Sequence, residues 1–257
     1  TDVGKSDEII DCCSKNGYKI IDFDDKAYPK RLKEIINPPA VLYVDGELPD
    51  IDNLVCIGMV GTRKASEYAI KAAHIMAKGI TEAGALVVSG GALGIDTYSH
   101  LGALACGGKT VAVLGNGLGN NYLKANEGLR NMIKQSGALV TEYQPNIPAN
   151  RTSFPMRNRI ISGLSLGVLV VEAGVKSGSL ITANLAIEQN RDVYAVPASI
   201  FSSDFSGTNK LISDGARLAI NPVNVVEAYE NDYPTLDLSK IRTANEIVLD
   251  NSEKTLD

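Results

Sequence analysis

Short apolar runs alternate along the chain with longer segments in which apolar residues recur every three or four positions. The short runs, rich in Val, Ile and Leu, begin near residues 54, 85, 110, 138, 167 and 192 and indicate buried strands. The periodic segments predict helices over 66–84, 94–108, 125–137, 154–165 and 179–190. Because alternating strands and helices require parallel crossovers, we expect an α/β fold: an extended Rossmann-like, doubly wound, mostly parallel sheet with helices on both faces.

The segments on either side of this alternation are less regular. Residues 7–16 favour a helix, 19–23 and 40–44 favour short strands, and the chain after residue 229 is acidic and weakly periodic. We therefore predict an N-terminal appendage over residues 1–52, a Rossmann-like domain over 53–230 and an acidic tail or linker over 231–257. The first residue is Thr1 rather than methionine, which leaves open a longer product with flanking domains.

Composition narrows the class of protein. Of the 257 residues 44% are hydrophobic, yet no apolar run is long enough to cross a bilayer and no signal peptide opens the chain, so we expect a cytoplasmic protein. The four cysteines have neither CxxC spacing nor a histidine partner, and we expect them to be reduced and structural: Cys12, Cys13, Cys56 and Cys106. We expect no metal site and no cofactor.

The charge is unevenly distributed, although the net value is −5. Residues 1–52 hold 12 acidic and 7 basic side chains, residues 53–226 hold 10 and 15, and residues 227–257 hold 8 and 3. A basic centre between acidic ends is compatible with an anionic partner or with chance scatter on solvated faces. The motifs have to decide between them.

The first motif, GTRKAS, follows the strand that begins at residue 54 and leads into a helix. Gly61 allows a tight turn, Ser66 is a candidate helix cap, and Arg63 and Lys64 stand where a phosphate would meet the helix N-terminus. A solvated basic pair is the alternative. Because ligands of open α/β sheets bind at the carboxyl ends of strands, we favour an anion site.

A second basic motif surrounds the strand that begins at residue 167. Arg157, Asn158 and Arg159 precede this strand on a predicted helix, and Lys176 lies in the Ser/Gly-rich turn after it. The backbone of Ser177, Gly178 and Ser179 then opens the next predicted helix, where free N–H groups favour anions. These residues are the second part of the predicted anion site.

A third motif, SGGALGIDTYSH, is a strand followed by a glycine-rich turn. Ser89, Gly90 and Gly91 are candidates for a nest of backbone N–H groups around a phosphate. Asp96 and His100 lie four apart on the following helix; with no nucleophile placed beside them, we favour a structural Asp–His pair over an acid–base pair.

The remaining motifs are weaker. The run LGNGLGNNY has GxGxG rather than the dinucleotide fingerprint, and GGKT lacks the first P-loop glycine and precedes a strand, so we reject ATP binding there. Glu142 and Glu172 each end a strand and invite an acid–base interpretation. We favour structural or arginine-orienting roles for both carboxylates.

Taken together, GTRKAS, SGGALGID with His100, TVAVLGNGL, TEYQP, FPMRNRIISGLS, VVEAGVKSGSLITANLA and SGTNKLISDGA resemble the DNA processing protein A family (DprA, also called Smf). The resemblance covers roughly Tyr28 to Tyr229 in unbroken order. Two positions depart from the family pattern: Met156, which is basic in some relatives, and Ala198-Ser199, where a glycine is common.

The resemblance implies a non-enzymatic protein that binds and protects single-stranded DNA and helps to load the RecA recombinase during natural transformation. It places the basic pocket at Arg63, Arg157, Arg159 and Lys176, with backbone donors from 89–91 and 177–179. It also implies a homodimer, for which the candidates are Leu211, Ile212 and Leu218, although these residues equally suit a core. Family members often carry a helical domain before this region and sometimes a winged-helix domain after it.

Two other functions stay open. Nucleotide-cleaving enzymes of the lysine-decarboxylase-like type share the layout, but their expected PGGxGTxxE motif is not matched by EAGVKSGSLIT. A domain that senses a free nucleotide is the third class. A groove for a DNA strand should track the sugar-phosphate backbone with little base preference and strong salt dependence.

Overall fold

The computed structural model describes residues 3–120 and 124–241. Its centre is one sheet in which nine strands are described, in the order β1-β2-β6-β5-β4-β3-β7-β8-β9. Seven of them pair in parallel: β3 (Cys56–Val60), β4 (Leu86–Ser89), β5 (Thr110–Val113), β6 (Ala138–Thr141), β7 (Gly167–Val170), β8 (Asp192–Ala195) and β9 (Arg217–Leu218). The predicted Rossmann-like, mostly parallel sheet is therefore confirmed.

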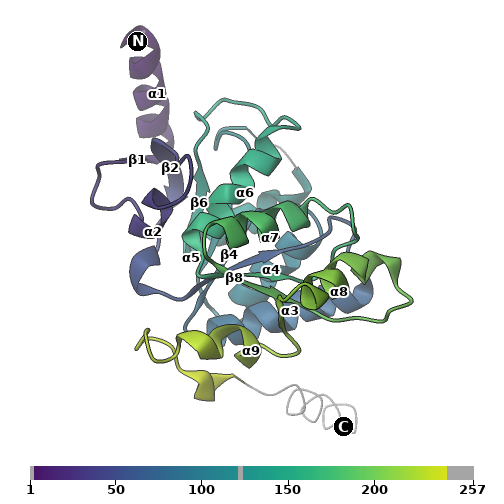
Figure 1. Cartoon of the computed structure of the whole chain (residues 1–257). Coiled ribbons are helices and arrows are strands. Elements are labelled where there is room, and N and C mark those ends of the chain that lie inside the picture. The colour runs from purple at the N-terminus through teal and green to yellow at the C-terminus, as the bar shows by residue number, and fades with distance from the viewer. Residues whose placement is uncertain (1–2, 121–123, 242–257) are drawn as a thin grey trace, which may run out of the picture.

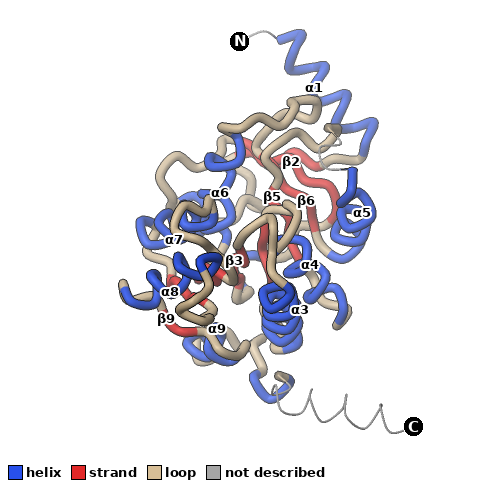
Figure 2. The backbone as a smooth tube through the Cα atoms, turned by 90° about the vertical axis from the view of Figure 1, so that its right-hand side faces the viewer, coloured by secondary structure: helices blue, strands red, loops and turns tan. Residues whose placement is uncertain are grey.

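Helices cover both faces of this sheet (Figures 1 and 2). On one face pack α3 (Glu67–Glu82), α4 (Ile95–Ala105) and α5 (Glu127–Ser136). On the other face pack α6 (Ser153–Leu164) and α7 (Ser179–Glu188), while α8 (Ser206–Ser213) lies near β8. Strand residues pointing alternately to the two faces build apolar cores on both sides, one beneath α6 and α7 and two on the face of α3, α4 and α5, as a sheet buried on both sides requires.

The strand order reverses direction between β3 and β7. From β3 the chain steps outward through β4 and β5 to β6, and then α6 returns it to the other side of β3, where β7 begins. The loops at the carboxyl ends of β3 and β7 consequently diverge to opposite faces. Such a switch point leaves a crevice, which is the usual ligand site of an open α/β sheet.

The N-terminal segment extends this sheet. Strands β1 (Lys19–Asp22) and β2 (Val41–Gly46) are antiparallel, and β2 pairs with β6 in the register Tyr43 to Thr141. Helix α1 (Val3–Asn16) projects away from the body beyond them, and the short α2 (Lys30–Lys33) packs near α6 (Figure 1). Residues 1–52 thus contribute strands to the sheet that carries the switch point.

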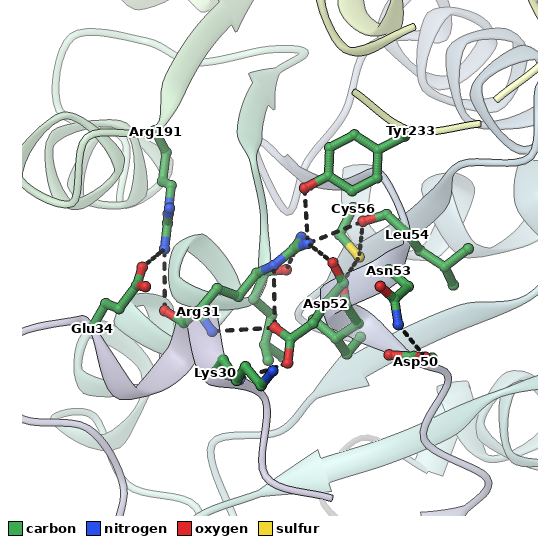
Figure 3. A network of polar contacts seen from close by, with 12 residues as sticks. Lys30, Arg31, Glu34, Asp50, Asp52, Asn53, Leu54, Cys56, Arg191 and Tyr233 are labelled. Carbon is green, nitrogen blue, oxygen red and sulfur yellow. Dashed lines mark hydrogen bonds and ion pairs between the residues drawn. The ribbon is translucent and has the colours of Figure 1, made fainter. Parts of the chain in front are cut away.

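The segment predicted as an acidic tail or linker is described up to residue 241, and the rest lies outside the described residues. After α9 (Val223–Val226), Leu236 and Ile241 are buried in the core beneath α3. The Tyr233 hydroxyl accepts a hydrogen bond from the buried Arg31 guanidinium, which also donates to the Asp52 and Leu54 carbonyls (Figure 3). This network ties residues near both ends of the described chain to the amino end of β3, away from the switch point at the carboxyl end.

Candidate nucleic-acid interface

A pocket of about 580 Å³ opens at the switch point. Its walls come from the β3–α3 turn, the start of α6 and the β7–α7 loop, with part of the β4–α4 turn at its floor. Its lining includes seven of the predicted site residues: Gly61, Arg63, Arg157, Asn158, Ser177, Gly178 and Ser179. The sequence motifs therefore converge on one cavity.

Arg63 is the exposed cation of the β3–α3 turn. Helix α3 begins at Glu67 with Ser66 as its cap, because the Ser66 hydroxyl accepts from the Ala69 N–H at 3.2 Å, as predicted. The Arg63 guanidinium lies 4.9 Å from the centre of the Phe154 ring, which lines the same pocket. Stacking on an aromatic face restricts the side chain while leaving its N–H groups directed outward. Lys64 is exposed beside it but is not part of the lining.

Arg151 also lines the pocket, and the sequence interpretation missed it. It lies in the turn before α6, where the Asn150 carboxamide oxygen accepts from the Thr152 and Ser153 N–H groups, each at 2.8 Å. Arg151 is exposed, so its charge is available at the rim. The available signal was a further arginine just ahead of FPMRNR, in the loop that opens a helix.

Arg157 occupies the floor rather than the rim. Only 4% of it is exposed, and its Nη1 donates to the Gly90 carbonyl at 2.5 Å and to the Val113 carbonyl. Burial lowers the pKa of Arg157, and the Asp96 carboxylate opposes that effect. The guanidinium therefore joins the ends of β4 and β5 to α6, and contributes positive potential from below.

The turn after β4 is filled by the protein's own groups. The Ser89 hydroxyl donates to the Met59 carbonyl at 2.6 Å, and the Ala92 N–H donates to the Asp96 carboxylate at 3.2 Å. A Cβ on Gly90 would meet the Arg157 guanidinium and the Asp96 carboxylate, so a larger residue there would displace these side chains. Gly90 and Gly91 line a smaller adjoining cavity together with Arg130, a second arginine that sequence interpretation missed.

The predicted Asp96–His100 pair is wrong. Asp96 faces Arg157 and the Ala92 N–H, and its pKa is raised by burial. The His100 Nδ1 instead lies 2.8 Å from the Thr110 hydroxyl, which itself donates to the Val87 carbonyl, so Nδ1 carries the proton. Burial, with a smaller effect of Arg157, lowers the pKa of His100 to about 3. Their spacing places Asp96 and His100 on one face of α4, but Asp96 bonds to the turn after β4 and His100 bonds to Thr110 on β5.

Arg159 lies outside the pocket lining, and its charge is paired. Its two terminal nitrogens donate to both oxygens of Glu142, each at 2.6 Å, and its Nε donates to the Asn37 carbonyl. The predicted arginine-orienting role of Glu142 is thereby confirmed. Glu172 is also structural, as predicted, because its carboxylate accepts the Ser66 N–H at 2.9 Å.

The β7–α7 loop supplies the last wall. Ser177, Gly178 and Ser179 line the pocket where α7 begins, and the Ser177 hydroxyl accepts the Ser179 N–H at 3.4 Å. The Ser177 and Gly178 carbonyls accept the next two N–H groups of the helix. The N–H groups that were predicted to be free are therefore already bonded, and this wall offers an anion the positive end of the α7 dipole. Lys176 is exposed next to this wall and is not part of the lining.

The candidate dimer residues have mixed environments. Leu211 packs against the core, Ile212 is half-buried, and Leu218 on the edge strand β9 is 48% exposed. In the described residues no helix is long and apolar enough to span a membrane, and no three His, Cys, Asp or Glu side chains gather as a metal site. The four cysteines, all within the described residues, are free thiols.

Fold and site together define a class: a Rossmann-like protein whose switch-point pocket is lined by arginines and suits an anionic ligand. Comparison with known proteins narrows that class. The family model of DNA recombination-mediator protein A matches residues 19–230. The chain is 38% identical over 223 residues to the DNA processing protein DprA of Bacillus subtilis, covering 87% of this chain and 75% of that protein.

Two solved structures agree with this assignment. The X-ray structure of DprA from Streptococcus pneumoniae aligns with a TM-score of 0.79 and 38% identity, covering 85% of this chain and 77% of that one. A structure of DNA processing protein A from Helicobacter pylori, described for its single-stranded DNA binding mode, aligns with a TM-score of 0.75 and 29% identity, covering 84% and 97%. The chain belongs to the DNA recombination-mediator protein A family.

Proposed function

We propose that the chain is a binding protein for single-stranded DNA and that the pocket between β3 and β7 holds the sugar-phosphate backbone. The observation that carries this proposal is the exposed Arg63, stacked on Phe154 and facing the same cavity as Arg151 and the start of α7. Cations and an aromatic ring in the lining of one pocket suit a charged backbone that carries flat bases. The single-stranded DNA binding mode for which the structure of the Helicobacter pylori relative is described supports the choice of a single strand.

The pocket's charges explain why binding should not depend on base sequence. Its lining holds Arg63, Arg151 and Arg157 against one acid, Asp96, which accepts the Ala92 N–H and is electrostatically stabilised by Arg157. Arginine N–H groups grip phosphate oxygens, which carry no sequence information. We do not assign a catalytic step, because the acids at these strand ends hold protein groups: Glu142 holds Arg159 and Glu172 holds Ser66.

The length of the ligand tests this proposal. We expect fluorescence anisotropy to show that an oligonucleotide of about ten or more residues binds far more tightly than a mononucleotide, because a strand contacts several cations at once. Poly-dT and a mixed sequence of equal length should bind within about threefold of each other. Equal affinity for the mononucleotide and the oligomer would instead indicate a nucleotide-sensing pocket, and cleavage of a nucleotide would indicate the enzymatic alternative.

The finer part of the proposal concerns partners. The family's description as recombination mediators supports loading of RecA onto incoming DNA in the cytoplasm of a transformable cell, and exposed Leu218 on the free edge of β9 supports a homodimer. Sedimentation velocity at micromolar concentration tests the dimer, and a monomer would contradict it. Unchanged rates of RecA assembly on coated single strands in the presence of the protein would contradict the loading role.

A further inference from the structure

The turn that carries Arg63 is held at both ends by one residue outside the pocket. Glu172 follows β7, and its backbone carbonyl accepts the Thr62 N–H at 2.9 Å while its carboxylate accepts the Ser66 N–H at 2.9 Å. Thr62 and Ser66 bracket Arg63 and Lys64. A single residue of the neighbouring strand thus fixes the start and the end of the basic turn.

The turn is also supported from beneath. The Thr62 carbonyl accepts from the Ile95 N–H at 3.1 Å, and a Cβ on Gly94 would lie 2.3 Å from that carbonyl oxygen. Gly94 has a φ of 77°, which favours glycine, and it leaves no room for a side chain under the turn. With α4 pressing from below and Glu172 holding both ends, the turn has little freedom except at its exposed side chains.

Glu172 itself does not belong to the pocket lining and is 1% exposed. Its second carboxylate oxygen, Oε1, is buried and has no hydrogen-bond partner, so the Ser66 N–H is what the side chain grips. Burial raises the pKa of Glu172. A buried acid that is held at one oxygen by Ser66 and leaves the other oxygen without a partner is costly to the fold.

The geometry points to Glu172 as a positioning residue of the DNA site, acting through the β3–α3 turn. This inference rests on the proposed function. A turn held in one conformation presents Arg63 and Lys64 ready for a phosphate, whereas a loosened turn has to be ordered on binding, which lowers the apparent affinity by the fraction of competent molecules. The carboxylate contributes to binding without touching the ligand.

A double-mutant cycle tests the inference, since residues that act through one another are not additive. The probe is a fluorescent dT oligomer, and the four proteins are wild type, Glu172→Ala, a variant with Arg63→Ala and Lys64→Ala, and the combination of all three changes. We expect Glu172→Ala to weaken binding about tenfold in the wild-type background and less than twofold where the turn has lost both cations. Glu172→Gln, whose amide oxygen can still accept the Ser66 N–H, should restore most of the affinity.

Asp52→Ala is the matched control. The Asp52 carboxylate also holds backbone N–H groups, those of Lys30 at 2.8 Å and Arg31 at 3.2 Å, but before the amino end of β3, whose carboxyl end carries the pocket (Figure 3). Its loss should lower the melting temperature and leave DNA affinity within about twofold. If Glu172→Ala does not fold, Glu172→Asp, which draws the carboxylate back by one methylene, replaces it in the cycle.

The outcomes separate the inference from the proposed function. If the Arg63 and Lys64 changes weaken binding, but Glu172→Ala has no effect or weakens binding equally in both backgrounds, the positioning role is overturned and the DNA site stands. Failure of wild type to bind the oligomer would overturn both. Non-additive loss with rescue by glutamine would establish the role of Glu172.

Discussion

Two arginines of the site have opposite environments. Arg63 is exposed and stacks on Phe154, whereas Arg157 is 4% exposed and donates to the carbonyls of Gly90 and Val113. The free N–H groups of Arg63 suit a ligand, while those of Arg157 hold strand ends together. Removing either arginine should therefore have a different consequence.

Arg157→Leu should destabilise the fold. The change removes the donor to the Gly90 and Val113 carbonyls and the positive charge near the buried Asp96 carboxylate. Because a buried acceptor without its partner costs about 1–3 kcal/mol, we expect the free energy of unfolding in urea to fall by about 3–5 kcal/mol. Arg63→Ala, at an exposed position, should change it by no more than about 0.5 kcal/mol. Equal midpoints and slopes for wild type and Arg157→Leu would contradict the structural role.

At this scale the sequence predicted where charge gathers but not which charges are free. Arg157 shares the buried face of α6 with Ile160, Ile161 and Leu164, a spacing of three, four and seven residues that marks it as inward-facing. That signal was present in the sequence. The pairing of Arg159 with Glu142 was predicted as an alternative use of the acid, but the contribution of Arg151 depends on the fold of an irregular loop.

Among the elements, α4 carries titratable groups into the core. Its first turn holds Asp96 beneath the pocket, and one turn later His100 lies against β5 with its Nδ1 bonded to Thr110. His100 is fully buried, and its Nε2 has no hydrogen-bond partner. A charged imidazole is therefore strongly disfavoured in this position.

Acid should destabilise the protein through His100. Burial lowers its folded-state pKa to about 3 from the ordinary 6.5, so below pH 6.5 the unfolded chain takes up a proton that the folded chain does not. The free energy of unfolding is therefore not reduced by His100 above pH 6.5. As the pH falls from 6.5 towards 3, it decreases by at most about 1.4 kcal/mol per pH unit.

The control for this effect is His100→Asn, whose amide can donate to Thr110 but does not titrate. We expect the unfolding free energy of wild type, measured by urea denaturation, to fall relative to that of this variant as the pH is lowered from 7 to 4. Asp96, whose pKa is raised by burial, acts in the opposite direction in both proteins and cancels in the difference. Parallel pH profiles for the two proteins would contradict the assignment.

Alternating periodicity predicted the central strands and helices because their buried faces repeat regularly. The ends were harder. The sequence predicted an appendage for the segment that contains β1 and β2. In the structure β2 pairs with β6 through backbone hydrogen bonds, which no side-chain pattern predicts. Likewise, the acidic composition of the last residues gave no indication that Leu236 and Ile241 are buried. Their burial beneath α3 depends on contacts with residues distant in the sequence.

In the whole molecule the site follows from strand order. The sequence predicted that the motifs lie at carboxyl ends of parallel strands, but not that β3 and β7 are neighbours, since pairing between distant strands leaves no local pattern. That adjacency puts GTRKAS and the Ser177–Ser179 loop on two sides of one pocket. At the amino end of β3, Arg31 joins Asp52 to Tyr233 (Figure 3).

The affinity of Arg63→Glu for a dT oligomer, measured at several salt concentrations, tests the central claim most directly. The matched control is Lys71→Glu, which reverses a charge on the exposed surface of α3 and lies outside the pocket lining. We expect Arg63→Glu to remain folded and to lose at least tenfold in affinity, since a charge-assisted hydrogen bond contributes about 1.5–3 kcal/mol, whereas Lys71→Glu should lose no more than about threefold. Arg63→Ala should lower the salt slope of log K by about 0.7, one phosphate contact of a single strand. An Arg63→Glu variant that binds as tightly as Lys71→Glu would contradict the assignment of this pocket to the DNA backbone.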